Sequence, residues 1–146
     1  MALTRHVGIV TGANHGIGAA TARRLAADSV AVLLGFFGEP DPSPVLEAIH
    51  NAGGRADAVH ADLRDPETPA RLFDVAEAAF GPVDVLVNNA SAGGQDSFRG
   101  DERDRIGRAL QRVSVASASA PLDVDARGSA LLIAEFARRH IARDAT

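Results

Sequence analysis

The sequence predicts an α/β fold, a Rossmann-like, doubly wound parallel sheet with four strands in the order 3-2-1-4. Short apolar runs alternate with amphipathic helical patterns, turn residues bound each run, and a glycine-rich segment joins the first run to the first helix. Elements that alternate in this way form right-handed crossovers around a parallel sheet. The 146 residues are expected to form a single domain, 1–146, with a helical C-terminal part from about residue 101.

The first two strands are predicted from continuous apolar runs. Residues 7–10 predict the first strand, and residues 30–34 predict a second strand that is covered on both faces and ends near Gly35. Between them, the apolar residues of segment 16–28 recur at helical spacing. We therefore expect a helix that connects two parallel strands.

The next elements are bounded by proline and glycine. A proline-rich loop at 38–44 precedes a short helix over 45–52, and Gly53 and Gly54 end that helix. Residues 56–60 alternate weakly between apolar and polar side chains. They predict the third strand.

A second crossover leads to strand four. Asp65 can cap a helix that tolerates Pro66 in its first turn, and Gly81 and Pro82 end it. The expected buried face of this helix consists of Leu72, Phe73, Ala76 and Phe80. The apolar run 83–87 then predicts the fourth strand.

The pattern changes after residue 90. We expect a flexible stretch to residue 100, a charged helix over 101–115, a break of small residues at 116–121 and a long helix over 124–141. No fifth strand follows in the pattern. Strand four is therefore expected to be an apolar edge unless a helix or another subunit covers it.

Composition excludes several classes of function. The net charge is −4, and the 15 cationic residues are all arginines scattered along the chain, so we expect no nucleic-acid partner. No signal peptide and no apolar run of membrane-spanning length is found, which favours a cytoplasmic protein without a membrane partner. The absence of cysteine excludes disulfides and thiol catalysis, and the five histidines show no metal-binding spacing.

The glycine-rich segment 11–18, Thr-Gly-Ala-Asn-His-Gly-Ile-Gly, is the strongest functional signal. It joins a strand to a helix, where free backbone N–H groups and the helix dipole favour a pyrophosphate. Glycines let the backbone approach that ligand without a clash of Cβ atoms. The alternative is a tight turn that needs glycine for its backbone angles alone.

Together with Asp62-Leu63 after strand three and Asn88-Asn89-Ala90 after strand four, this segment makes residues 3–141 resemble the first half, or slightly more, of a short-chain dehydrogenase/reductase. The resemblance implies that glycines 12, 16 and 18 shape the pyrophosphate pocket. It also implies that Asp62 accepts a hydrogen bond from the adenine amino group and that residues 88–90 line the ribose side. The expected cofactor-binding residues are Gly12, Asn14, His15, Gly16, Ile17, Gly18, Phe36, Asp62, Leu63, Asn88, Asn89 and Ala90.

Each of these assignments has a simpler alternative. Asp62 could cap the next turn, and Asn88 and Asn89 could merely end a strand, since Asn tolerates unusual backbone angles. His15 stands where NADP enzymes of the family often carry Arg or Lys. A partly exposed loop histidine is more common than a phosphate ligand, so His15 is a candidate only.

The form of the cofactor depends on the end of strand two. A carboxylate there would bond the ribose hydroxyls and repel a 2′-phosphate, but the matching residue is Phe36, and the first acidic residue is Glu39. No arginine lies at this point of the sequence to bind the phosphate. NADP(H) is favoured over NAD(H) on this basis.

The catalytic residues of the family have no counterpart in the chain. The resemblance implies hydride transfer between nicotinamide and a small carbonyl or alcohol substrate, with a Tyr as acid and base and a Lys beside it, and this sequence contains neither residue type. In the family, the catalytic Ser and the YxxxK pair would follow residue 141, so a segment looks missing. We expect no activity from this chain alone. The alternatives are a non-catalytic nucleotide-binding module and a truncated chain that acts only by association.

Two features of the last helix also follow from the resemblance. Asp125 stands where the family has an Asn that supports the proton relay, although it could be a solvated helix residue. The helix around 128–136 forms a dimer interface in the family, which implies a homo-oligomer. Its apolar stripe, made up of Leu131, Leu132, Phe136 and Ile141, could instead belong to the core.

Overall fold

A computed structural model describes residues 6–94, 96–99 and 102–144 of the chain. Its main sheet has four parallel strands, β1 (Val7–Thr11), β2 (Ala31–Phe36), β3 (Ala56–His60) and β4 (Val85–Val87). Their order is β3-β2-β1-β4, which confirms the predicted topology.

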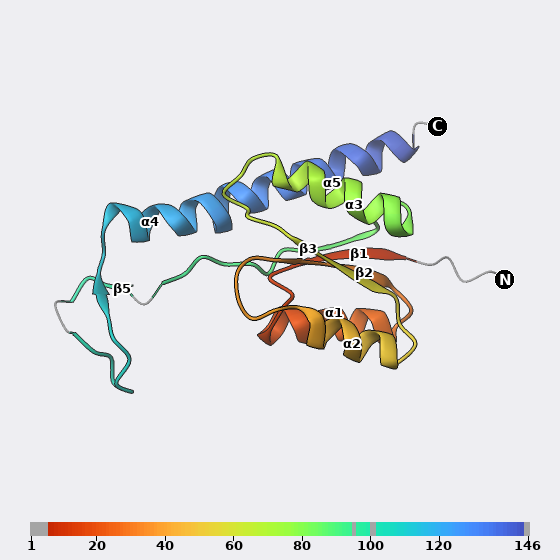
Figure 1. Cartoon of the computed structure of the whole chain (residues 1–146). Helices are drawn as coiled ribbons and strands as arrows, with labels where there is room; N and C mark the ends of the chain where they lie inside the picture. The colour runs from red at the N-terminus through yellow and green to blue at the C-terminus, as the bar shows by residue number, and fades with distance from the viewer. Residues whose placement is uncertain (1–5, 95, 100–101, 145–146) are drawn as a thin grey trace.

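Helices cover both faces of this sheet. Helices α1 (Gly16–Ala27) and α2 (Ser43–Asn51) lie on one face, and α3 (Thr68–Phe80) and α5 (Ser129–Asp144) lie on the other (Figure 1). None of the described helices is long and apolar enough to cross a lipid bilayer.

Alternate strand residues build two cores, one on each face. Ile9 and Leu33 pack with α3 and α5, whereas Val10 and Leu34 pack with α1 and α2, and all four side chains are fully buried. Strands of a parallel sheet with helices on both faces need apolar residues at successive positions. The continuous runs in the sequence have this origin.

The segment predicted as a helix over 101–115 folds differently. Its described residues form turns, an antiparallel bridge from Arg103 to Ala109, and β6 (Gln111–Arg112), which pairs with β5 (Asp96–Ser97). The Asp104 side chain accepts hydrogen bonds from the N–H groups of residues 106 and 108, and Gly107 adopts a φ of +83°. This Asx-type turn chemistry overrides the helical pattern. Residue 101 lies outside the described residues.

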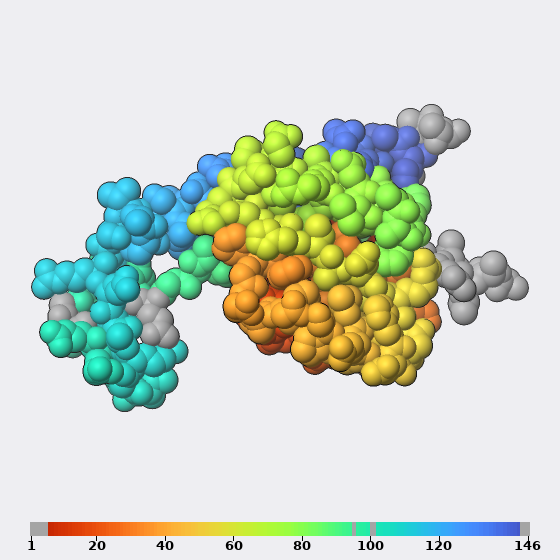
Figure 2. Space-filling view, in the orientation of Figure 1, coloured from red at the N-terminus to blue at the C-terminus, as the bar shows by residue number. Residues whose placement is uncertain are grey.

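Residues 91–94, 96–99 and 102–114 run outward from the body of the molecule as an arm (Figures 1 and 2). The large side chains of Phe98 and Ile106 on this arm are exposed. The arm corresponds to the predicted flexible stretch and charged helix.

The predicted break at 116–121 is helical. Helix α4 (Val115–Pro121) begins with a capping box, in which the Ser114 hydroxyl accepts a bond from the Ser117 N–H at 3.2 Å and the Ser117 hydroxyl accepts one from the Ser114 N–H at 2.9 Å. Alanine is the strongest helix former, so a run of Ala and Ser with a cap at its start forms a helix. Pro121 stands directly before a π-helical segment, η1 (Leu122–Gly128), that continues into α5.

The apolar stripe of the last helix is divided between core and surface. Leu132 is fully buried, and the Phe136 ring lies 6.2 Å from the Phe73 ring, so these two side chains belong to the core on the α3 side. Ile133 and Ile141 are exposed.

The edge strand β4 is half-buried at each of its residues.

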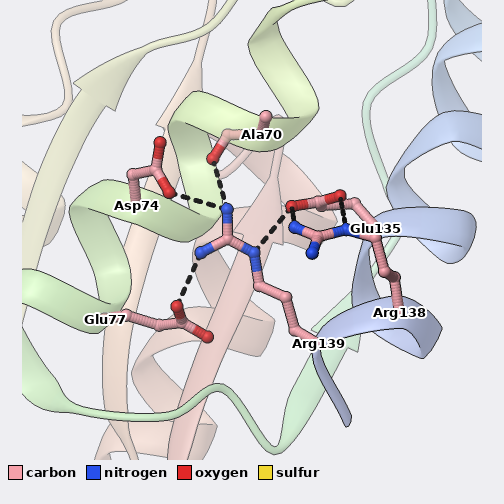
Figure 3. Close-up of polar contacts among 6 residues, drawn as sticks. All are labelled: Ala70, Asp74, Glu77, Glu135, Arg138 and Arg139. Carbon is pink, nitrogen blue, oxygen red and sulfur yellow. Dashed lines mark hydrogen bonds and ion pairs between the residues drawn. The ribbon is translucent and has the colours of Figure 1, made fainter. Parts of the chain in front are cut away.

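Arg139 fastens α5 to α3 (Figure 3). Its guanidinium donates hydrogen bonds to Glu77 and Asp74 of α3, each at 2.6 Å, and to Glu135 of its own helix, also at 2.6 Å. Burial alone would lower the pKa of Arg139, but the hydrogen bonds to the three carboxylates raise it. Glu135 also accepts two bonds from Arg138, and these bonds, with those from Arg139, lower its pKa to about 2.

We predict that Glu135→Gln lowers the free energy of unfolding by about 1 to 3 kcal/mol at pH 7, because hydrogen bonds to a charged acceptor are lost. The carboxylate is stabilised in the fold, so its contribution is complete above its unfolded pKa of 4.5 and disappears as pH falls towards about 2. Urea unfolding followed by far-UV circular dichroism at several pH values measures this difference. Glu47→Gln, on the exposed side of α2, is the matched control, and a deficit that does not shrink between pH 4.5 and 2 would contradict the account.

Candidate functional site

A cavity of about 500 Å³ opens at the carboxyl ends of β1, β2, β3 and β4, which is where ligands bind in open parallel sheets. Its volume is in the range of small-molecule and cofactor sites. Nineteen residues line it: Thr11, Gly12, Asn14, His15, Gly16, Ile17, Gly35, Phe36, Phe37, Ala61, Asp62, Leu63, Arg64, Asn89, Ala90, Ser91, Ala92, Ala120 and Val124.

The turn between β1 and α1 depends on close packing of its glycines. A Cβ atom on Gly18 would lie 2.2 Å from the Gly12 carbonyl oxygen, so only glycine fits there. Gly12 itself has a φ of +63°, in the left-handed region that favours glycine. These contacts bring the first turn of α1 directly against the end of β1.

The start of α1 presents free backbone donors to the cavity. His15 precedes the helix but makes no side-chain cap, and the first turn contains no acidic residue. The N–H groups of the first turn of a helix have no partner within the helix, and the helix dipole adds positive potential. Gly16 has open space where its Cβ would stand, so an anion can approach the backbone there.

Two polar side chains tie the end of β1 to the loop after β4. The Thr11 hydroxyl accepts hydrogen bonds from the Asn89 and Ala90 N–H groups, both at 3.1 Å. In return, the Asn89 amide donates to the Thr11 and Gly12 carbonyls at 3.0 and 3.1 Å. Asn89 thus holds the glycine turn as well as lining the cavity.

Other turn residues divide into buried and exposed groups. The Asn14 side chain is buried and donates to the Pro40 carbonyl at 2.8 Å, so it connects the turn to the loop after β2. His15 and Ile17 are exposed at the mouth of the cavity. The bond to Pro40 gives Asn14 a structural part in the turn.

The far side of the cavity carries a charge pair. The Asp62 carboxylate accepts hydrogen bonds from the Arg64 guanidinium, the shortest at 2.7 Å, and these bonds lower the pKa of Asp62. The guanidinium also lies over the Phe37 ring, 4.9 Å from its centroid. Leu63 is buried and packs against η1. A Cβ atom added to Gly128 of η1 would lie 3.0 Å from the Leu63 Cβ.

Asp125 is exposed yet hydrogen-bonded. Its carboxylate accepts bonds from the Ser91 hydroxyl at 2.8 Å and from the Ala92 N–H at 2.9 Å, so it connects η1 to the loop after β4. A carboxylate is a pure acceptor and suits two donors of this kind. Irregular π-helical turns such as η1 are frequent at functional sites.

Ten of the twelve residues predicted to bind a cofactor line this cavity. The two others are Gly18, which packs behind the turn, and Asn88, which is exposed outside the lining. Sequence reasoning did not single out Arg64, Phe37 or Thr11 as individual site residues. Arg64 stands two residues after Asp62, and this short spacing is the feature of the sequence that could have identified it as a site residue.

A family profile described as short chain dehydrogenase matches residues 6–120. The chain belongs to this family. It is 47% identical over 89 residues to a cis-4-hydroxycyclohexanecarboxylate dehydrogenase from Sinomonas cyclohexanicum, a match that covers 61% of this chain and 35% of that protein.

Solved structures of the family have the same fold. A metagenomic short-chain oxidoreductase in complex with NADP is 33% identical, with a TM-score of 0.77 over 94% of this chain and 57% of that one. A short chain dehydrogenase from Burkholderia cenocepacia J2315, also in complex with NADP, is 33% identical with a TM-score of 0.73 over 91% of this chain and 50% of the other. The chain thus spans about half the length of these structures and about a third of the curated relative.

Gly18→Ala is expected to lower the free energy of unfolding by more than about 2 kcal/mol, because the new Cβ overlaps the Gly12 carbonyl. Gly94→Ala is the matched control, since open space surrounds that position, and its effect should stay within about 0.5 kcal/mol. Urea unfolding measures both. Equal stability of the two variants would show that the turn is not packed as described.

Proposed function

We propose that this chain is the cofactor-binding part of an NAD(P)-dependent oxidoreductase, folded as one domain over residues 1–146, and that it binds NADP(H) in preference to NAD(H). The observation that carries the proposal is the cradle at the start of α1. There, Gly18 leaves no room for a Cβ atom, and the first N–H groups of the helix have no side-chain cap. A cavity of about 500 Å³ adjoins them.

The residues present fit a dinucleotide. The N–H groups of the 12–18 turn would hold the pyrophosphate, and Asp62 with Leu63 would hold the adenine. Asn89 and Ala90 would line the ribose next to the nicotinamide, with Asn88 beside them. When bound, the cofactor supplies a hydride acceptor or donor. The protein supplies position and a pocket lined largely by apolar side chains.

Two features support a preference for the phosphorylated cofactor. Phe36 ends β2, so no carboxylate at that point repels a 2′-phosphate. His15, at the position where NADP enzymes of the family often carry Arg or Lys, lies exposed at the cavity mouth. The NADP complexes among the solved relatives agree with this preference.

We further propose that the chain alone does not turn over a substrate. A carbonyl or alcohol substrate needs an acid or base at its oxygen, and the sequence offers no Tyr or Lys for this task. Asp125 stands at the position of the family's Asn. Its carboxylate accepts hydrogen bonds from Ser91 and Ala92, which suits a residue that positions the loop after β4.

Two alternatives remain as competing proposals. A nucleotide-binding module without catalysis would show the same cofactor affinity, and a chain that acts by association would use exposed apolar surface. Ile133 and Ile141 on α5 offer such a surface, on the helix whose segment 128–136 the family resemblance assigns to a homo-oligomer. Sedimentation velocity distinguishes association from binding alone.

The cofactor preference is tested by titration of NADPH and NADH, followed by the fluorescence of the reduced nicotinamide. The protein contains no Trp or Tyr, so its own emission interferes little. We expect saturable binding of both, with the tighter dissociation constant for NADPH. Tighter binding of NADH would contradict the preference, and no binding of either would contradict the proposed function.

The absence of turnover is tested with a panel of ketones and secondary alcohols in the presence of each cofactor. We expect no change in nicotinamide absorbance above that of a protein-free blank, because no proton donor of the required kind is available. Steady oxidation or reduction that scales with protein concentration would overturn this expectation.

A further inference from the structure

Arg64 occupies the side of the cavity where β2 and β3 end. Its guanidinium lies 4.9 Å from the centroid of the Phe37 ring and forms a forked pair with the Asp62 carboxylate, with Nε to Oδ1 at 2.9 Å and Nη2 to Oδ2 at 2.7 Å. Both neighbours line the same cavity as Arg64. The side chain therefore stands beside Phe37, which directly follows the end of β2 at Phe36.

Several contacts fix this position. The Phe37 ring contacts His60 at 5.2 Å between ring centroids, so the guanidinium stacks on an aromatic ring that has a neighbour of its own. The Arg64 carbonyl accepts a hydrogen bond from Arg127 of η1 at 2.8 Å, so the backbone is held as well. An arginine that is positioned in this way retains less side-chain freedom than one in solvent.

The guanidinium keeps binding capacity in this arrangement. Asp62 accepts from Nε and Nη2, and Nη1 has no hydrogen-bond partner among residues 6–94, 96–99 and 102–144. Arginine presents five donors in a planar fork that matches phosphate oxygens. Half of the side chain is exposed and Arg64 lines the cavity, so an anion in the cavity can approach the guanidinium.

We propose that Arg64 is a specificity-determining residue that binds the 2′-phosphate of NADP(H) while it remains paired with Asp62. The inference rests on the proposed function, because it assigns one group of that cofactor to one residue. Arg64 replaces the basic residue that the end of β2 lacks, although it comes from the loop after β3.

Charge balance explains why the pair matters. Asp62 alone would repel a 2′-phosphate, which carries between about 1.5 and 2 negative charges at pH 7. Arg64 neutralises the carboxylate and offers its remaining donors to the phosphate. The Asp62 carboxylate also accepts the Arg64 backbone N–H at 3.0 Å, so its roughly four acceptor sites are in use, and a hydrogen bond from the adenine amino group would replace the longest of these contacts, that from Nε at 3.1 Å.

The test is Arg64→Gln, measured by titration with NADPH and with NADH. The inference predicts that affinity for NADPH falls about tenfold to 100-fold, as expected for the loss of hydrogen bonds to a charged group, while affinity for NADH changes less than threefold. Arg55→Gln is the matched control, since Arg55 stacks on the Phe80 ring at 5.1 Å and is absent from the cavity lining. It should leave both affinities unchanged.

One further variant makes the test independent of folding. Arg64→Lys keeps the charge without the fork and should give an intermediate loss for NADPH, with an unchanged far-UV spectrum. NADH affinity of Arg64→Gln within threefold of that of the unmodified protein shows that the variant site is folded.

The outcomes separate the inference from the function it rests on. An equal loss of NADPH and NADH affinity would show that Arg64 only holds Asp62, and no loss would show that the phosphate binds elsewhere. Either result overturns the inference and leaves the proposed function intact. If the unmodified protein binds neither coenzyme, both fall together.

Discussion

The site depends on the close approach of three backbone segments at the end of β1. Gly18 packs against the Gly12 carbonyl, and Asn89 reaches across from the loop after β4 to bond the Thr11 and Gly12 carbonyls. The side-chain amide satisfies carbonyl groups that the turn leaves free, and the missing Cβ of Gly18 permits the distance. These contacts direct the free N–H groups of α1 into the cavity.

The other end of the cavity is organised by charge pairs and by the last helix. Arg64 neutralises Asp62 at the end of β3, and Arg127 of η1 holds the Arg64 backbone. The position of η1 depends in turn on α5, which Arg139 fastens to α3 through carboxylates of both helices. A network of ion pairs outside the cavity lining thereby supports one wall of the cavity.

Much of the fold could be predicted because its signals are local. The buried strands are continuous apolar runs, and the glycines of the first turn occur where a strand pattern changes to a helix pattern. Alternating elements predict a parallel sheet with right-handed crossovers, and the order 3-2-1-4 follows if that sheet is doubly wound. Most of the predicted cofactor residues line the cavity because they follow strands that end at the same edge.

The remaining features required knowledge of three-dimensional contacts or of turn chemistry. The pattern over 101–115 predicted a helix, but the structure has a turn at Asp104 and Gly107. The small residues at 116–121 are helical because Ser114 caps the start of α4. The stacking of Arg64 on Phe37 joins two loops that lie far apart in sequence. Neither apolar periodicity nor spacing carries that information.

The central claim is that the backbone of the β1–α1 turn holds the paired phosphates of a nicotinamide dinucleotide. It is tested most directly by mapping the amide chemical shifts of the isotope-labelled protein during a titration with NADPH. The account predicts that the largest changes fall on the amides of residues 12–18, with further changes at 62–64 and 89–92. Saturable binding that leaves the 12–18 amides unshifted would contradict it.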